Sequence, residues 1–199
     1  YLTLMNETYS QPAMPKGVEG GICKGIYKLL SQKGKNTKVQ LLGSGTILNE
    51  VIKASEILSE EYEIGSDVYS VTSFNELTRN GQDVARQNML NPDGKPNTPY
   101  VADVMGNEPA IAATDYMKNY AEQIRAFIPA ESYLVLGTDG FGRSDSRENL
   151  RTHFEVNRHY VVLATLSQLA ERGDVKKNIV TEAIKKYGVD TSKPNPLLS

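Results

Sequence analysis

The stretch VQLLGSGTILNEVIKASEILSEEY, from Val39 to Tyr62, joins an apolar run, a Gly-Ser-Gly turn and a segment with helical periodicity. After the turn, apolar side chains recur at the spacing of one helix face: Ile47, Leu48, Val51, Ile52, Ala54, Ile57 and Leu58. A strand that leads directly into an amphipathic helix is the building unit of α/β folds. The stretch therefore predicts a strand, a tight turn and a helix.

The same alternation continues along the chain. Three more apolar or β-branched runs predict strands, and the segments after them have helical periodicity. The strand candidates are SDVYSV, PAIAAT and YLVLG, and the helix candidates are NELTRNGQDVARQNML, PYVADVM, DYMKNYAEQIRAF, HYVVLATLSQLAERG and VKKNIVTEAIKKYG. Asp174 is expected to cap the last helix, and NPDGKPNTP is expected to be a loop. Strands that alternate with helices predict a mainly parallel sheet with helices on both faces, which is a three-layer α/β/α domain.

The first residues do not fit this alternation. YLTLM, at residues 1–5, is a short apolar run that leads into polar and proline-rich sequence, and the chain has no initiator Met. We expect residues 1–18 to be the end of a preceding domain and a linker, and residues 19–199 to form the α/β domain. GGICKGIYKLL is expected to be helical, with Cys23 packed or facing water.

Composition narrows the function classes. A net charge of -2 and a pI near 5.8 give no basic field for nucleic acid, and no run of about 18 apolar residues is present to span a membrane. Cys23 is the single cysteine, which rules out an intramolecular disulfide. A cytoplasmic location is therefore expected.

The most polar stretch is LGTDGFGRSDSRENLRTHF, from Leu136 to Phe154. Its glycines allow a tight turn, and Asp145 and Glu148 have the spacing of a capping box for a helix that reaches Phe154. Arginines recur every four residues, so their face could be solvated, could meet a carboxylate of another protein, or could bind an anionic ligand. The candidate interface residues are Asp139, Arg143, Ser144, Asp145, Arg147 and Arg151.

Other motifs carry little chemistry. Gly43-Ser44-Gly45 could hold a phosphate, but it lacks the third glycine of a dinucleotide motif and the lysine of a P-loop. His153 and His159 have no zinc-motif partner, and Ser144 is not in a nucleophile-elbow motif. No catalytic, cofactor-binding or metal-binding residue is assigned.

Several segments carry a family resemblance. SVTSFNELTRNGQD, TPYVADVM, TDYMKNYAEQIRAFIP and LGTDGFGRSDSRENLRTHFEVN resemble the C-terminal domain of the homodimeric pyruvate dehydrogenase first component, within the transketolase-like superfamily. The opening YLTLMNETYSQPAMP resembles the segment before that domain. The DGFGRS sequence at residues 139–144 is shared more loosely with transketolases, and the RSDSRENLRTHFEV continuation resembles the pyruvate enzyme specifically.

The resemblance implies a five-stranded sheet with four parallel strands and one antiparallel strand. It also implies a homodimeric parent enzyme that uses thiamin diphosphate and magnesium to decarboxylate pyruvate and acetylate lipoyl groups. Its partners would be the dihydrolipoyl acetyltransferase and dihydrolipoyl dehydrogenase components. The cofactor signature of the family is absent from this chain, so the resemblance implies a domain for dimer assembly and support that is not itself catalytic.

Two alternatives stay open. The chain could be the C-terminal domain of a transketolase-type enzyme. It could instead be an independent flavodoxin-like module that binds a phosphate or nucleotide at the strand ends, through Gly43–Thr46 and Arg143–Arg151.

Overall fold

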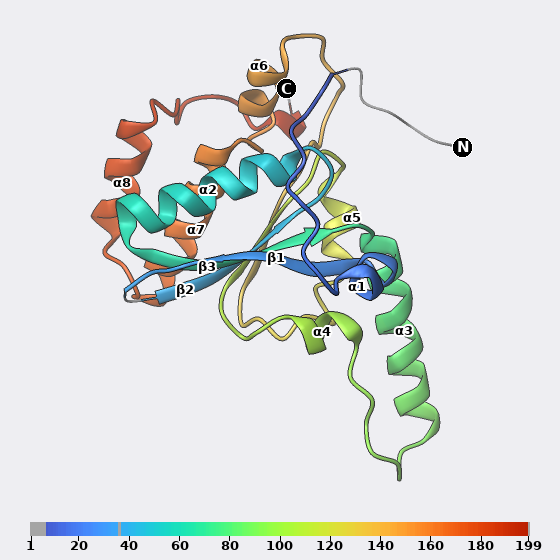
Figure 1. Ribbon diagram of the computed structural model, residues 1–199. Helices are drawn as coiled ribbons and strands as arrows, with labels where there is room; N and C mark the ends of the chain where they lie inside the picture. Colours follow the sequence, from blue (N-terminus) through green and yellow to red (C-terminus); the bar gives the residue numbers. More distant parts are fainter. Residues whose placement is uncertain (1–6, 36, 199) are drawn as a thin grey trace.

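The computed structural model describes residues 7–35 and 37–198, which form one mixed sheet between two layers of helices (Figure 1). The strands lie in the order β1-β3-β2-β4-β5. Their bounds are Ile26–Gln32 (β1), Thr37–Gly43 (β2), Ile64–Val71 (β3), Ala110–Ala113 (β4) and Tyr133–Leu136 (β5). Strand β1 pairs antiparallel with β3, and the other pairs are parallel. The three-layer α/β/α fold, with four parallel strands and one antiparallel strand, is confirmed.

The helices divide between the two faces of the sheet. Their bounds are Glu19–Lys24 (α1), Ile47–Tyr62 (α2), Phe74–Leu90 (α3), Tyr100–Val104 (α4), Lys118–Glu122 (α5), Arg147–His153 (α6), Arg158–Arg172 (α7) and Lys177–Lys186 (α8), followed by the 3₁₀ turn η1 (Pro196–Leu198). Helices α2, α7 and α8 build one apolar core, and α3, α4 and α5 build the other. Successive strand residues serve opposite cores, since Ile111 belongs to the first and Ala112 to the second. The sheet is thus buried on both faces, as parallel sheets require.

The expected helix around Cys23 is only half right. Helix α1 ends at Lys24, and IYKLL forms strand β1 instead. Gly25 ends the helix with φ +102°, and a Cβ there would lie 2.6 Å from the Ser73 carbonyl oxygen. The chain turns at this glycine, and the pairing of β1 with β3 outweighs the local helical pattern. Cys23 itself is exposed.

Two other local predictions were wrong in detail. DYMKNYAEQIRAF was expected to be one helix, but α5 covers only Lys118–Glu122 and tighter i to i+3 turns continue to Phe127. The Phe127 ring fills the space that the missing side chain of Gly81 leaves on α3, and this contact sets the path of the segment. Asp174 does not cap α8, which begins after Lys176, and its carboxylate pairs with Arg172 at 2.9 Å.

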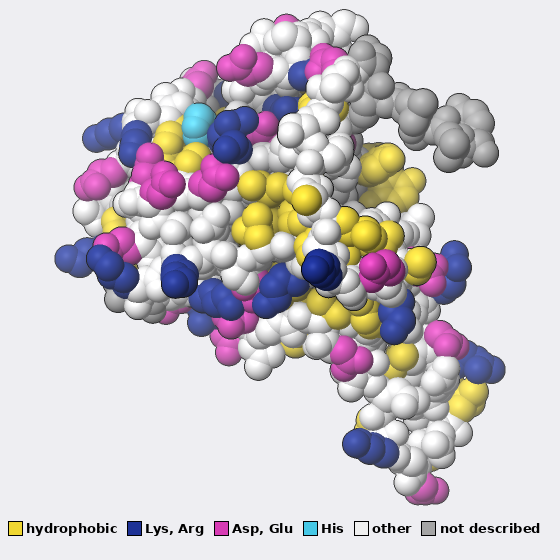
Figure 2. Space-filling model, viewed as in Figure 1, with side chains coloured by type: hydrophobic (Ala, Val, Ile, Leu, Met, Phe, Trp, Pro, Cys, Tyr) yellow, Lys and Arg dark blue, Asp and Glu magenta, His cyan; other side chains and the backbone are white. Residues whose placement is uncertain are grey.

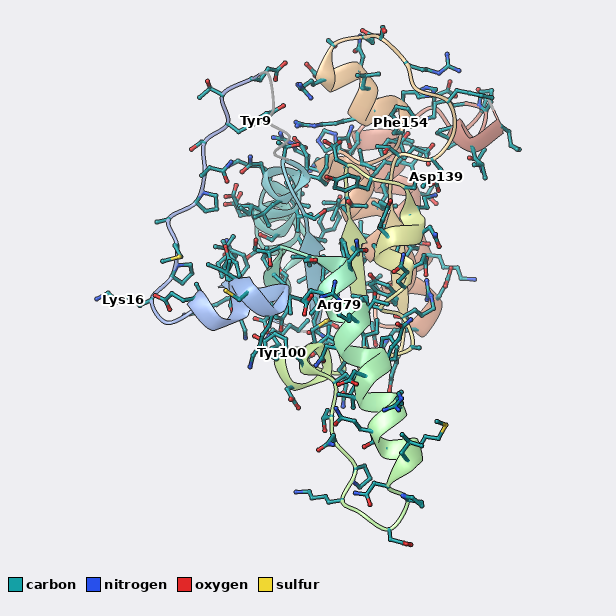
Figure 3. All side chains as sticks on the ribbon, turned by 90° about the vertical axis from the view of Figure 1, so that its right-hand side faces the viewer. Tyr9, Lys16, Arg79, Tyr100, Asp139 and Phe154 are labelled. Carbon is teal, nitrogen blue, oxygen red and sulfur yellow. The ribbon has the colours of Figure 1, made fainter. Side chains whose placement is uncertain are left out.

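The amino-terminal segment and the α3 arm lie outside the compact layers. From Lys16 to Tyr9 the chain runs along the side of the molecule toward α6 (Figure 3). The end of α3 and the loop after it stand clear of the body (Figure 2). The expected strand at residues 1–5 lies outside the described residues, and the boundary between 18 and 19 stays a prediction. No helix in the described part of the chain is long and apolar enough to cross a membrane.

Candidate interface at the carboxyl ends of the strands

The polar stretch of residues 136–154 lies at the carboxyl ends of β4 and β5. Strand β5 ends at Leu136, a loop follows, and helix α6 begins at Arg147. Gly140 has φ +100°, and a Cβ at this position would lie 2.3 Å from the Pro196 carbonyl oxygen. The glycine therefore lets the C-terminal turn η1 pack directly on the loop. Figure 3 shows Tyr9, Asp139 and Phe154 at this same end of the molecule.

Side chains within the loop fix its shape. Asp139 accepts a hydrogen bond of 3.0 Å from the Lys118 backbone N–H and faces the Lys118 ammonium at 3.8 Å. Thr138 donates to the Asp115 carbonyl oxygen at 2.8 Å. These bonds attach the loop to the segment between β4 and α5. Asp139 thus has a structural role within the chain.

The expected capping box at Asp145 and Glu148 is wrong. Ser146 is the N-cap of α6, and its hydroxyl accepts from the Asn149 backbone N–H at 3.3 Å. Asp145 lies one residue too early and accepts from the Ser146 backbone N–H and from the Asn149 side chain. Serine is a favoured N-cap residue, so helix α6 begins directly after Ser146. The carboxylate of Asp145 is exposed and braces the cap from outside.

A buried carboxylate on α2 receives two of the arginines. Glu50 is 4% exposed and accepts from Arg151 at 3.1 Å and from the Arg158 side chain at 2.9 and 3.0 Å. The Arg158 backbone N–H also donates to it at 3.0 Å. Burial is the largest single influence and raises the pKa of Glu50, but the hydrogen bonds from Arg158 and the charges of Arg158 and Arg151 together lower it. Sequence analysis did not identify Glu50. Its one signal in the sequence is an acidic residue next to the apolar face of α2.

The amino-terminal segment covers the other arginine of α6. Arg147 pairs with Glu7 at 2.9 Å. The Tyr9 ring lies 5.9 Å from the guanidinium carbon of Arg147 and 5.7 Å from that of Arg151, and its hydroxyl donates to Glu7 at 3.1 Å. Burial and the bond to Glu7 raise the pKa of Tyr9, while the two guanidinium charges oppose that shift. We call this contact of Glu7 and Tyr9 with Arg147 and Arg151 the strap contact.

Arg143, Ser144 and Asp145 are the exposed members of the candidate interface. Arg143 forms no ion pair with any residue that the structure describes. With Arg147 and Arg151 it lines a pocket of about 390 Å³, and Leu150, Phe154 and Val156 are the apolar side chains of the lining. The structure thus brings all three arginines of the sequence pattern to one pocket.

The Gly-Ser-Gly turn lies at the same edge of the sheet. The Ser44 hydroxyl donates to Thr114 at 2.8 Å, and the Thr46 hydroxyl to Asp115 at 3.4 Å. Asp115 also lines the arginine pocket. The two segments considered for phosphate binding therefore share one neighbour, but the hydroxyls of the turn are already used within the chain.

The histidines lie in packed surroundings. The His153 ring meets Phe154 edge to face at 4.9 Å, and the His159 ring stacks on Tyr187 at 4.5 Å. Burial is the main cause that lowers the pKa of each. Within residues 7–35 and 37–198, no three His, Cys, Asp or Glu side chains gather in a way that could hold a metal ion.

Large apolar side chains are exposed around the same loop. Phe141 is 81% exposed, Tyr116 61% and Met117 52%, and the turn η1 beside Gly140 adds Leu197 and Leu198. Backbone bonds hold these segments together, since Thr138 donates to the Tyr116 carbonyl oxygen at 2.9 Å. Clustered apolar exposure on an otherwise polar surface is typical of a protein contact. We call these five residues the apolar rim.

The fold and the arrangement of this edge define a domain class. Residues 25–157 match the transketolase-like TK C-terminal domain family, so the chain belongs to that family. It is 59% identical over 199 residues to the pyruvate dehydrogenase E1 component of Escherichia coli (strain K12), covering 100% of this chain and 22% of that protein. The corresponding protein of Pseudomonas aeruginosa is 58% identical over 200 residues, covering 99% of this chain and 23% of that protein. The chain therefore spans about a fifth of the length of these curated relatives.

Solved structures agree on the fold. Transketolase from Leishmania mexicana aligns with a TM-score of 0.51 and 21% identity, covering 77% of this chain and 19% of that one. Transketolase from Campylobacter jejuni aligns with a TM-score of 0.51 and 17% identity, covering 79% of this chain and 20% of that one. At these identities the likeness is one of fold.

Proposed function

We propose that the chain serves as the C-terminal domain of a pyruvate dehydrogenase of the E1 type, and that its task is assembly. The parent would decarboxylate pyruvate and transfer the acetyl group to a lipoyl carrier. The observation that carries this proposal is 59% identity to such an enzyme over the whole chain. Most of the described polar groups at the strand ends are bonded within the chain and are therefore not available to a substrate. This supports an assembly role over a catalytic one.

The cofactor that the resemblance implies does not fit this chain. Magnesium requires several oxygen ligands beside the diphosphate that it neutralises. The described residues contain no acidic or histidine cluster for it, and the pocket beside α6 presents guanidinium groups that would repel a metal cation. Thiamin diphosphate and magnesium would therefore be held by other parts of the parent, and this chain would be inactive alone.

Calorimetric titration of the 199-residue chain with thiamin diphosphate in the presence of magnesium tests this proposal. We expect no saturable binding below about 100 µM, which corresponds to about -5.5 kcal/mol. The full-length parent enzyme, titrated in parallel, is the positive control. Saturable binding to the isolated chain that requires magnesium would show that part of the cofactor site lies here, whereas binding without magnesium would report the diphosphate alone.

Assembly would use the apolar rim together with the exposed part of the candidate interface. Arg143 and Ser144 project beside Phe141, whereas Asp139, Asp145, Arg147 and Arg151 hold the loop and helix that present them. Apolar side chains with an arginine at their edge are typical of contact residues in protein interfaces. The partner we propose is the second subunit of a homodimer.

The proposal includes the cellular location and the partners of the parent enzyme. The parent would work in the cytoplasm, within a complex that includes dihydrolipoyl acetyltransferase and dihydrolipoyl dehydrogenase. The exposed thiol of Cys23 is compatible with a reducing compartment.

A transketolase-type parent is the second candidate, because the matching family includes that class. The two parents act on different substrates. An assay of the full-length enzyme with pyruvate and with a ketose phosphate distinguishes them, and turnover of the ketose phosphate alone would overturn the first proposal.

A further inference from the structure

Three arginines and one aspartate are the charged residues that line the arginine pocket. Among the described residues, Glu7 and Glu50 pair with two of these arginines, Arg147 and Arg151. Glu50 is shared between Arg151 and Arg158, and Glu7 pairs with Arg147. Arg143 has no carboxylate partner among the described residues. Arg143, which is exposed, is therefore the pocket arginine that an incoming anion meets without a competing carboxylate among the described residues.

An ion pair within the chain shows that one of these arginines binds a carboxylate. Glu7 brings a carboxylate to within 2.9 Å of Arg147. The guanidinium fork makes paired hydrogen bonds to planar carboxylates and to phosphates. Within reach of the same pocket, Arg143 offers a second fork that is not engaged in an ion pair. The two groups together suit a small oxyanion.

The two internal ion pairs differ in how readily they can be displaced. The side chains of Arg151 and Glu50 are 17% and 5% exposed, so this pair is well protected from water. The side chains of Arg147 and Glu7 are 31% and 53% exposed, and exposed pairs contribute little to stability. An incoming anion would therefore compete with Glu7 and leave Glu50 in place.

We propose that the pocket lined by Arg143, Arg147 and Arg151 binds a small oxyanion, a carboxylate or a phosphate, and that the bound anion displaces Glu7 and loosens the strap contact. The volume of about 390 Å³ and the apolar lining by Leu150, Phe154 and Val156 leave room for an organic group attached to the anion. The inference uses Arg143, which the proposed function also places at the subunit contact, so it is tested on this chain alone.

The chain contains no tryptophan, so Tyr9→Trp places a single tryptophan, which can be excited selectively, beside the two arginines. The variant is titrated with inorganic phosphate and, separately, with acetate, at constant ionic strength maintained with chloride. We expect a saturable change in tryptophan emission with at least one of the two anions. The anion with the lower half-saturation concentration identifies the preferred source.

Two further variants test the assignment. Arg143→Gln in the Tyr9→Trp background should raise the half-saturation concentration about tenfold, since it removes charged hydrogen bonds. Arg79→Gln is the matched control, because Arg79 lies on α3 away from the pocket (Figure 3) and pairs with Glu76. It should leave the titration unchanged.

Calorimetry of the unmodified chain with the same anions guards against disturbance by the new tryptophan. The inference is overturned if neither anion gives saturable heat or fluorescence. It is equally overturned if Arg143→Gln and Arg79→Gln titrate alike.

Discussion

At the scale of single residues, Glu50 is the electrostatic centre of the loop region. Its buried carboxylate lies on α2 and accepts hydrogen bonds from Arg151 of α6 and Arg158 of α7, so one side chain joins three helices. A buried ion pair that loses one partner leaves the other charge uncompensated. The contact among the three helices depends on the Glu50 carboxylate, because both arginines are neutralised by it.

Glu50→Gln should therefore lower the free energy of unfolding by about 2 kcal/mol. Urea denaturation at pH 7 measures the change. Glu56→Gln is the matched control, because Glu56 lies on the same helix in an exposed i,i+3 pair with Lys53 and should change stability by less than about 0.5 kcal/mol. Equal effects of the two variants would contradict the role of Glu50.

The pH dependence of stability provides a second readout of Glu50. Its pKa is lower in the folded chain than the ordinary value of 4.5, so the folded state binds this proton less readily than the unfolded state. The resulting stabilisation is fully present above the unfolded pKa and is lost as the pH falls through the folded pKa. The wild type should thus lose more stability than Glu50→Gln below pH 4.5.

At the scale of elements, sequence patterns predicted the helices and strands whose positions are set by local hydrophobic periodicity. The β2-turn-α2 unit and strands β3 to β5 were found because their apolar spacing is regular. Strand β1 was missed because its antiparallel pairing with β3 is a long-range contact that the local pattern of GGICKGIYKLL does not report. The arginine spacing identified the right helix, but its carboxylate partners, Glu7 and Glu50, come from segments distant in sequence and could not be assigned from spacing.

Gly25 is the point at which α1 turns into β1. Gly25→Ala should destabilise the chain by about 1–3 kcal/mol, because its φ is +102° and the new Cβ would clash with the Ser73 carbonyl oxygen. Gly20→Ala in the same helix is the control, since nothing lies within 4 Å of a Cβ there. Thermal unfolding of both variants measures the difference. If Gly25→Ala were as stable as Gly20→Ala, the glycine turn would not be required for β1 to pair.

The amino-terminal segment should be dispensable for folding. None of residues 7–18 is buried, so we expect deletion of residues 1–18 to remove the strap contact and to leave both apolar cores intact. We expect the shortened chain to unfold cooperatively, as followed by circular dichroism during heating. A gradual, non-cooperative transition would place the segment within the core and move the domain boundary.

At the scale of the whole molecule, the faces of the sheet and the carboxyl ends of its strands differ in what covers them. Its two cores are closed by helices on both faces of the sheet, whereas the carboxyl ends of the strands carry the strap contact, the arginine pocket and the apolar rim. Binding surfaces at this edge are usual in α/β folds, because loops there are free to vary. We propose that this edge presents an assembly surface for a second subunit.

Phe141→Ala in the full-length parent enzyme tests that claim most directly, with subunit dissociation and the Michaelis constant for pyruvate measured on the same preparation. Phe141 is 81% exposed in this chain, so its truncation should leave the domain folded. Loss of a buried aromatic contact at an interface costs about 2 kcal/mol or more, so we predict a dimer dissociation constant raised at least about tenfold with an unchanged Michaelis constant. A dimer of unaltered strength with a Michaelis constant raised tenfold would contradict the account and place this edge in the active site.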